Sequence, residues 1–138
     1  MANTTFTIAV DFDGTCVEED FPRVGKDVFG AVIALKKLVA DGHRIILWTC
    51  REHSAFDGVE DTLQLAIDWF QRKGIPLFAV NGNPEVVGFP ISRKMSADIL
   101  IDDHSLGLPV GDDGLPDWFR IYRLVRQKQL DCNAKSDI

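Results

Sequence analysis

The sequence predicts an α/β fold in which a parallel sheet is flanked by helices. Strand-like and helix-like stretches alternate along the chain, the strand-like stretches are continuously apolar, and a polar loop follows each of them. Continuously apolar strands are typical of a parallel sheet covered on both faces. The chain has 138 residues, so we expect one domain spanning residues 1–138 with its core at about 6–130. Together these features favour a three-layer, Rossmann-like arrangement.

The first half of the chain supplies two strands and two helices. The β-rich run at 6–10 predicts a strand, and apolar residues at three- and four-residue spacing predict a helix over 27–41, with Gly42 as its stop. The apolar run at 44–48 predicts the second strand. A second amphipathic stretch predicts a helix over 59–73.

The second half continues the alternation with shorter elements. We expect strands at 77–80 and 98–101, a loop rich in Gly, Pro and Asp at 105–117, a final helix beginning near Trp118, and a frayed tail at 131–138.

Composition and charge exclude several classes of protein. The 15 Lys and Arg residues against 21 Asp and Glu give a net charge of −6, which argues against general nucleic-acid binding and against a membrane-surface protein. Apolar runs are far shorter than the roughly 20 residues of a membrane span. Three widely spaced cysteines without CxxC pairs suggest neither a disulfide framework nor a zinc site. Reduced thiols in a cytoplasmic protein fit this pattern.

Acidic residues follow two of the predicted strands. Asp11 and Asp13 come directly after the first strand, and Asp102 and Asp103 after the strand at 98–101. The carboxyl ends of parallel strands meet at one edge of a sheet, where such folds bind ligands. Four carboxylates at one edge repel one another unless a cation lies among them. Oxygen ligands without a Cys/His pattern favour Mg²⁺, which typically works beside a phosphate.

Other polar residues can reach the same edge. Thr49 offers a hydroxyl donor at the end of the strand at 44–48, and Lys94 offers an ammonium group that can neutralise phosphate charge. Arg51 is a candidate for binding the substrate, with a surface salt bridge as an equal alternative. Asn81 follows the strand at 77–80 and can reach the edge. For His53 and His104 a structural role is favoured.

In order along the chain, these segments resemble the motifs of the haloacid dehalogenase-like superfamily of phosphoryl-transfer enzymes. The matching segments are DFDGT at Asp11–Thr15, ILWT ending in Thr49, a lysine at Lys94, and ILIDD ending in Asp103. With the strand that precedes the first of them, they span residues 6–103, about three-quarters of the chain. The resemblance implies a haloacid dehalogenase-like fold.

The resemblance also implies a two-step hydrolysis of a phosphate monoester. Asp11 would attack the phosphorus and form an aspartyl-phosphate, and Asp13 would act as general acid and then general base. Mg²⁺ would be held by the Asp11 carboxylate, the Asp13 backbone carbonyl and Asp103, with Asp102 in a supporting position. Thr49 and Lys94 would bind the transferring oxygens. The substrate implied is a phosphorylated compound whose identity the motifs do not specify.

The spacing of the motifs leaves no room for the cap domain that many members of this superfamily insert. The intervals hold little beyond one helix and short connections, so the chain resembles the capless type. The segment 16–25, just after the first motif, is the expected flap. An open site needs a cover that excludes water, and either a macromolecular substrate or a neighbouring subunit of a homo-oligomer would supply it.

Three other functions remain as alternatives. A phosphoryl-accepting signalling receiver also uses acids, a Thr or Ser and a Lys on a parallel sheet, but its acidic pair precedes the accepting aspartate, whereas here Asp11 comes first and the pair at Asp102 last. A phosphotransferase would pass the phosphoryl group to an acceptor other than water. A binding module would retain the fold without catalysis.

Overall fold

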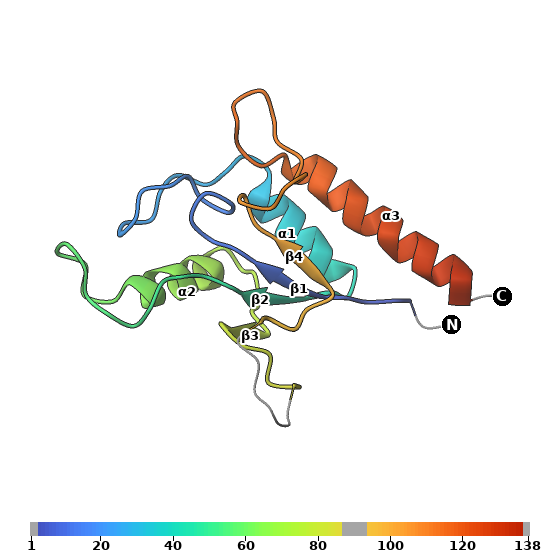
Figure 1. The fold of residues 1–138 in the computed structure, drawn as a ribbon, viewed down its shortest axis with the longest axis horizontal. Helices are drawn as coiled ribbons and strands as arrows, with labels where there is room; N and C mark the ends of the chain where they lie inside the picture. Colours follow the sequence, from blue (N-terminus) through green and yellow to red (C-terminus); the bar gives the residue numbers. More distant parts are fainter. Residues whose placement is uncertain (1–2, 87–93, 137–138) are drawn as a thin grey trace.

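The chain forms four strands and three helices that alternate in the predicted order. A computed structural model describes residues 3–86 and 94–136. The strands are β1 (Thr7–Val10), β2 (Arg44–Leu47), β3 (Ala79–Val80) and β4 (Ile99–Ile101), and the helices are α1 (Ala31–Ala40), α2 (Thr62–Arg72) and α3 (Trp118–Ser136) (Figure 1).

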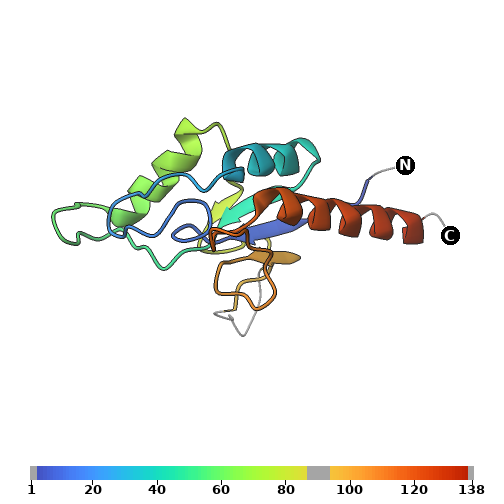
Figure 2. The same cartoon turned by 90° about the horizontal axis from the view of Figure 1, so that it is seen from above.

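All strand pairs are parallel, and the strands lie in the order β3-β2-β1-β4. The α/β, Rossmann-like class is therefore confirmed. Val10 at the end of β1 pairs with Leu47 of β2 and with Ile101 of β4, so these three strands end level with one another. The loops that follow them leave from one edge of the sheet, and the two termini lie toward the opposite edge (Figures 1 and 2).

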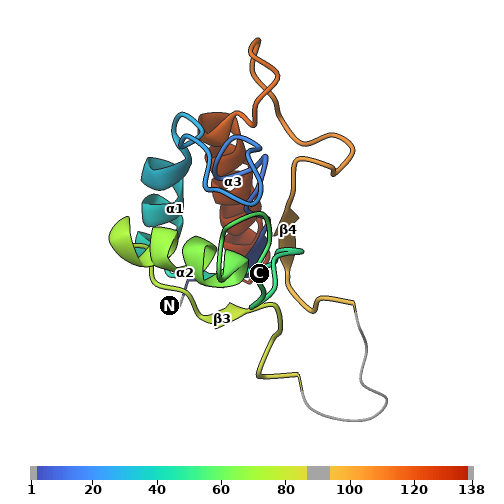
Figure 3. The same ribbon diagram turned by 90° about the vertical axis from the view of Figure 1, so that its left-hand side faces the viewer.

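The three helices gather on one side of the sheet (Figure 3). Ile8 and Val10 of β1 pack into the same buried cluster as side chains from α1, α2 and α3. Ala9 and Ile46 point to the other face, where they pack against Met95. α3 packs beside α1 on the first face, and all three described helices lie on that face.

Two helices begin later than their apolar patterns predict. The helix expected over 27–41 begins at Ala31, because Gly30 has a φ of 85° and serves as its N-cap. The helix expected over 59–73 begins at Thr62, after Asp61, whose side chain accepts a hydrogen bond from the Gln64 N–H as an N-cap does.

The expectation of a frayed tail is wrong for residues 131–136, which continue α3. The Asn133 side chain accepts a hydrogen bond of 2.7 Å from the Thr4 N–H, and Gln129 donates one of 2.8 Å to the Thr4 carbonyl. These contacts fix the end of the helix against the segment that leads into β1. Residues 137–138 of the expected tail lie outside the described residues. Among the described helices, none combines the length and the apolar character needed to cross a bilayer.

Candidate active site

Backbone hydrogen bonds continue past the strand ends and bring three loops together. The Asp11 N–H donates to the Ile101 carbonyl at 2.9 Å, and the Trp48 N–H donates to the Val10 carbonyl at 2.9 Å. The Asn81 N–H extends the same pattern to the Leu47 carbonyl at 2.7 Å. As a result, Asp11 and the loops after β2, β3 and β4 begin at one edge, as expected for a ligand site on a parallel sheet.

The Thr15 hydroxyl lies between two of the predicted carboxylates. Its oxygen is 2.9 Å from Asp11 Oδ2 and 3.1 Å from Asp103 Oδ1, and it accepts a hydrogen bond of 2.9 Å from the Asp103 N–H. Thr15 is fully buried. A hydroxyl has one proton, so it can donate to only one of the two carboxylates at a time. The first and last motifs are thus joined through a single side chain.

Glycine at position 14 permits this close approach. Gly14 has a φ of 84°, in the left-handed region. A Cβ atom there would lie 2.5 Å from Asp103 Oδ2, closer than non-bonded atoms approach one another. The glycine of the first motif is therefore required both by its backbone conformation and by the position of Asp103.

Acidic side chains lie close together at this site. Burial raises the pKa of Asp11 to about 8, with further contributions from the adjacent Asp103 carboxyl and the charge of Asp102, while the Thr15 hydroxyl opposes the shift. One oxygen of Asp102, one of Asp103 and one ring nitrogen of His104 also lie within 4.8 Å of one another. Carboxylate oxygens are the ligands that Mg²⁺ prefers, so the donors present fit that ion.

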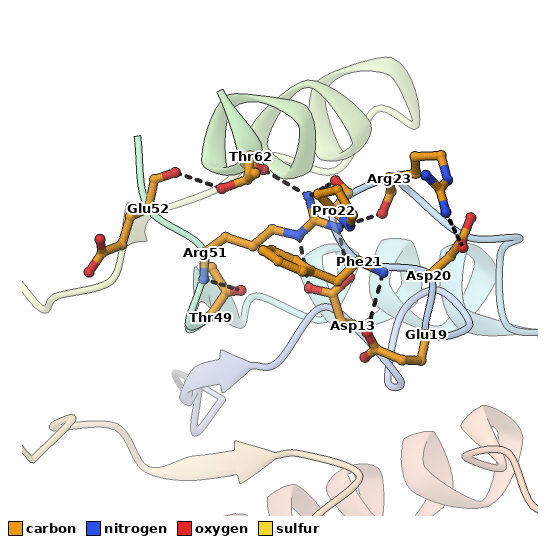
Figure 4. A network of polar contacts seen from close by, with 10 residues as sticks. All are labelled: Asp13, Glu19, Asp20, Phe21, Pro22, Arg23, Thr49, Arg51, Glu52 and Thr62. Atoms are coloured by element: carbon orange, nitrogen blue, oxygen red, sulfur yellow. Dashed lines mark hydrogen bonds and ion pairs between the residues drawn. The ribbon is translucent and has the colours of Figure 1, made fainter. Parts of the chain in front are cut away.

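Asp13 is held by a buried arginine. Arg51 Nε donates to Asp13 Oδ2 and Arg51 Nη2 to Asp13 Oδ1, both at 2.8 Å (Figure 4). Arg51 is only 2% exposed. It also donates to the backbone carbonyls of Pro22, Arg23 and Thr62, at 3.0, 2.6 and 2.9 Å.

These contacts correct both expectations for Arg51. A guanidinium has five N–H donors, and the five hydrogen bonds of Arg51 use all of them. None is left for a substrate in this geometry. Burial also distinguishes the pair from a surface salt bridge, because solvent screens such pairs only where they are exposed.

Thr49 lies in the loop after β2 with its backbone fixed. Its N–H donates to Asn81 Oδ1 at 2.8 Å, and its hydroxyl oxygen accepts a hydrogen bond of 3.1 Å from the Arg51 N–H. The second contact uses a lone pair of the hydroxyl, so the hydroxyl proton remains able to donate. Asn81, which has a φ of 54°, thus reaches this edge and orients the predicted phosphate-binding loop.

The contacts of the other predicted residues differ from one another. Lys94 is exposed and directly precedes Met95, which packs beneath β1 and β2. Its role toward phosphate stays a prediction. His104 is exposed, with Nδ1 3.5 Å from Asp102 and Asp103. His53 lies 2.9 Å from the N-cap residue Asp61, which agrees with a structural role.

No separate role for Thr15 was predicted, although Thr15 lies inside the first motif. A hydroxyl directly after the motif glycine, at the end of a buried strand, was the available signal. No sequence signal indicates the partners of Arg51. Its carbonyl acceptors at Pro22, Arg23 and Thr62 come close to it only when the loops fold.

The fold and these contacts define the class: an α/β protein with an acidic site at the carboxyl edge of a parallel sheet. A solved structure, of a conserved protein from Bacteroides thetaiotaomicron, is 39% identical to the chain. The match covers 91% of this chain and 93% of the other, with a TM-score of 0.74. The chain belongs to the family of that conserved protein. No protein-family model and no curated protein matches the chain.

Proposed function

We propose that the protein is a Mg²⁺-dependent phosphatase, a capless member of the haloacid dehalogenase-like superfamily that hydrolyses a phosphate monoester. The contact of Asp11 and Asp103 with the Thr15 hydroxyl supports this proposal most directly. It joins an acidic residue after β1 to one after β4, which is the arrangement that the motif order implies. A solvated Asp-Gly turn, the alternative for the first motif, has no reason to approach a second acidic loop.

Each step of the proposed reaction has a residue assigned to it. An oxygen of the Asp11 carboxylate attacks the phosphorus, and the bond from phosphorus to the leaving oxygen breaks. Asp13 gives a proton to that oxygen. Asp13 then takes a proton from a water molecule that attacks the aspartyl-phosphate, which releases inorganic phosphate and restores both carboxyl groups.

Charge at the site supports a role for a divalent cation. Asp11, the backbone carbonyl of Asp13 and Asp103 would hold Mg²⁺, with Asp102 beside them. When bound, Mg²⁺ offsets the repulsion between these carboxylates and an anionic phosphate. Thr49 donates its hydroxyl to an oxygen of the transferring group, and Lys94 supplies positive charge to the same group.

The cysteine pattern supports a reducing compartment such as the cytoplasm. Cys16, Cys50 and Cys132 are widely spaced and include no CxxC pair. Burial raises the pKa of the Cys16 thiol well above its usual range, with the charge of Asp11 as the next cause. Cys16 therefore stays protonated beside the nucleophile and does not compete with it.

A phosphatase assay with matched variants tests the proposal. Wild-type protein should release phosphate repeatedly from p-nitrophenyl phosphate only with Mg²⁺, and Asp11→Asn should lower the rate by at least about 1,000-fold with its circular dichroism unchanged. Asp98→Asn is the control, because Asp98 accepts a hydrogen bond from the Thr7 N–H at the opposite edge of the sheet. Activity that persists in Asp11→Asn would remove Asp11 as the nucleophile.

The same experiment separates the alternatives. A signalling receiver would hold its phosphoryl group and show little repeated release. A phosphotransferase would need an added acceptor, and a binding module would show no Mg²⁺-dependent turnover on any phosphorylated metabolite of a broad panel.

A further inference from the structure

We propose that Arg51 is a positioning residue that orients the Asp13 carboxylate, and that it does so only while the loop after β1 is docked. The inference rests on the proposed function, in which Asp13 exchanges a proton with the leaving group and with water. It adds that the orientation of Asp13 depends on a residue outside the motifs. Asp13 is aligned for proton transfer only when the loop is docked.

The hydrogen bonds of Arg51 restrict its carboxylate partner without blocking it. Nε and Nη2 each bind a different oxygen of Asp13, which fixes the plane of the carboxylate. Each carboxylate oxygen has a further lone pair. Asp13 can therefore still exchange a proton while its orientation is held.

Two rings complete the environment of the guanidinium. Arg51 Cζ lies 5.2 Å from the ring centroid of Phe12 and 5.1 Å from that of Phe21. Phe12 is a core residue directly before Asp13, whereas Phe21 belongs to the loop after β1. A buried charge is costly unless its partners are all in place. The position of Arg51 thus depends on both Asp13 and the loop.

The loop after β1 is held at two places, its base and its tip. At the base, Asp27 accepts a hydrogen bond of 2.8 Å from Trp69 Nε1 of α2. At the tip, which we define as residues 18–26, the carbonyls of Pro22 and Arg23 accept hydrogen bonds from Arg51 (Figure 4). These two hydrogen bonds are therefore made by the side chain that holds Asp13, while the Phe21 ring of the tip also packs against Phe56, with 5.3 Å between ring centroids.

Movement of the tip must therefore change the hydrogen bonds of Asp13. If the tip lifts, Arg51 loses two carbonyl acceptors and the Phe21 ring, and buried donors without acceptors are unfavourable. The guanidinium must then shift toward other acceptors, and its two hydrogen bonds to Asp13 change as a result. Such coupling is reciprocal, so a change at Asp13 must also loosen the tip.

Leaving-group dependence distinguishes positioning from a merely structural role. p-Nitrophenolate departs with little help from an acid, whereas phenolate needs a proton. We expect Arg51→Lys to lower kcat/KM on phenyl phosphate by about 100-fold, because a small misplacement of a reacting group has an effect of this size. The ratio kcat/KM reports the step that releases the leaving group, whereas hydrolysis of the aspartyl-phosphate is common to both substrates. The loss on p-nitrophenyl phosphate should be at least about tenfold smaller, and Asp13→Asn should show the same ordering.

Arg44→Lys is the matched control. Arg44 also makes a bidentate pair, with Glu85 at 2.6 and 2.9 Å, but it begins β2 at the opposite edge of the sheet. Its kinetics should match the wild type on both substrates. An equal loss of kcat/KM on both substrates in Arg51→Lys would overturn this inference and leave the proposed function standing. A wild-type protein that turns over neither substrate with Mg²⁺ would overturn the proposed function and this inference with it.

Limited trypsin digestion tests the coupling without any assay of activity. The tip contains the trypsin sites Arg23 and Lys26. Cleavage there should be about tenfold faster in Asp13→Asn and Arg51→Lys than in the wild type or Arg44→Lys, because proteolysis follows the population of the open loop. Cleavage of Asp13→Asn at the wild-type rate would overturn the coupling, even if Arg51→Lys proved too unstable to purify.

Discussion

The Thr15 hydroxyl accepts a hydrogen bond from the Asp103 N–H and lies within hydrogen-bonding distance of both the Asp11 and Asp103 carboxylates. Replacing Thr15 with valine keeps the shape of the side chain and removes the hydroxyl. The Asp103 N–H then has no acceptor there, so we expect the free energy of unfolding to fall by about 1–3 kcal/mol.

Urea unfolding without Mg²⁺ measures this effect. Thr15→Ser is the control, because it keeps the hydroxyl and removes only a methyl group. If the valine and serine variants unfold at the same urea concentration, the hydroxyl does not contribute as argued.

His43 makes stability depend on pH. It is 3% exposed, and its Nδ1 accepts a hydrogen bond of 2.9 Å from the Phe6 N–H. Burial lowers the pKa of His43 below its ordinary value of 6.5; the charge of Arg126 also lowers it, and Asp41 opposes the shift. The unfolded chain therefore takes up the proton first, so stability is lost as pH falls through about 6.5.

The matching variant is His43→Asn, whose side-chain oxygen can still accept from the Phe6 N–H. Unfolding free energy should decrease more steeply from pH 7 to pH 5 in the wild type than in this variant. Equal slopes in urea unfolding at the two pH values would contradict the assignment to His43.

At the scale of elements, the start of α1 is fixed by one glycine. Gly30 has a φ of 85°, and a Cβ atom there would lie 2.9 Å from Phe119 Cε2 of α3. Gly30→Ala should lower the free energy of unfolding by at least about 1–2 kcal/mol from backbone strain alone, and by more because of the ring.

Comparison with Gly58→Ala measures the contribution of the contact with the Phe119 ring. Gly58 has nearly the same φ, 83°, but a Cβ atom there meets nothing within 4 Å. In denaturant unfolding, Gly30→Ala should therefore be the less stable of the two variants. The opposite order would show that the Phe119 ring moves aside at no cost in stability.

The elements also show what the sequence can and cannot predict. Apolar runs predicted all four strands, since the apolar character and the length of a short run are local properties. The start of α1 was predicted too early, because the pattern of apolar residues continues through 27–30 while the conformation of Gly30 ends the helix. The order of the tail at 131–136 was missed, because it depends on a contact with Thr4, which is far away in the sequence and leaves no local pattern.

The same division holds for the site. Asp11 and Asp103 were predicted to share an edge because parallel strands impose it, and the Thr15 contacts agree. The burial of Arg51 was not predictable, because it depends on carbonyl groups that come from the loop after β1 and from the first residue of α2.

For the molecule as a whole, the proposed metal site predicts that Mg²⁺ stabilises the fold. Binding to the folded state alone raises the free energy of unfolding by about 2.7 kcal/mol at a concentration 100 times the Kd. Thermal unfolding with increasing MgCl₂ should show a rising Tm in the wild type and in Asp98→Asn. Asp103→Asn should lose most of the rise, and a rise equal to that of the wild type would exclude Asp103 as a ligand.

The parallel sheet places Asp11, Thr49 and Asp103 at one edge, and the Asp98 contact lies at the other. Covalent chemistry at Asp11 is the claim on which the proposed function depends. Acid quenching during turnover of p-nitrophenyl phosphate with Mg²⁺, followed by borohydride reduction and peptide mass spectrometry, tests it directly. We predict that residue 11 is recovered as homoserine, the reduction product of an aspartyl-phosphate. An unmodified Asp11 in a protein that is releasing phosphate, or a reduced aspartate at another position, would contradict the account.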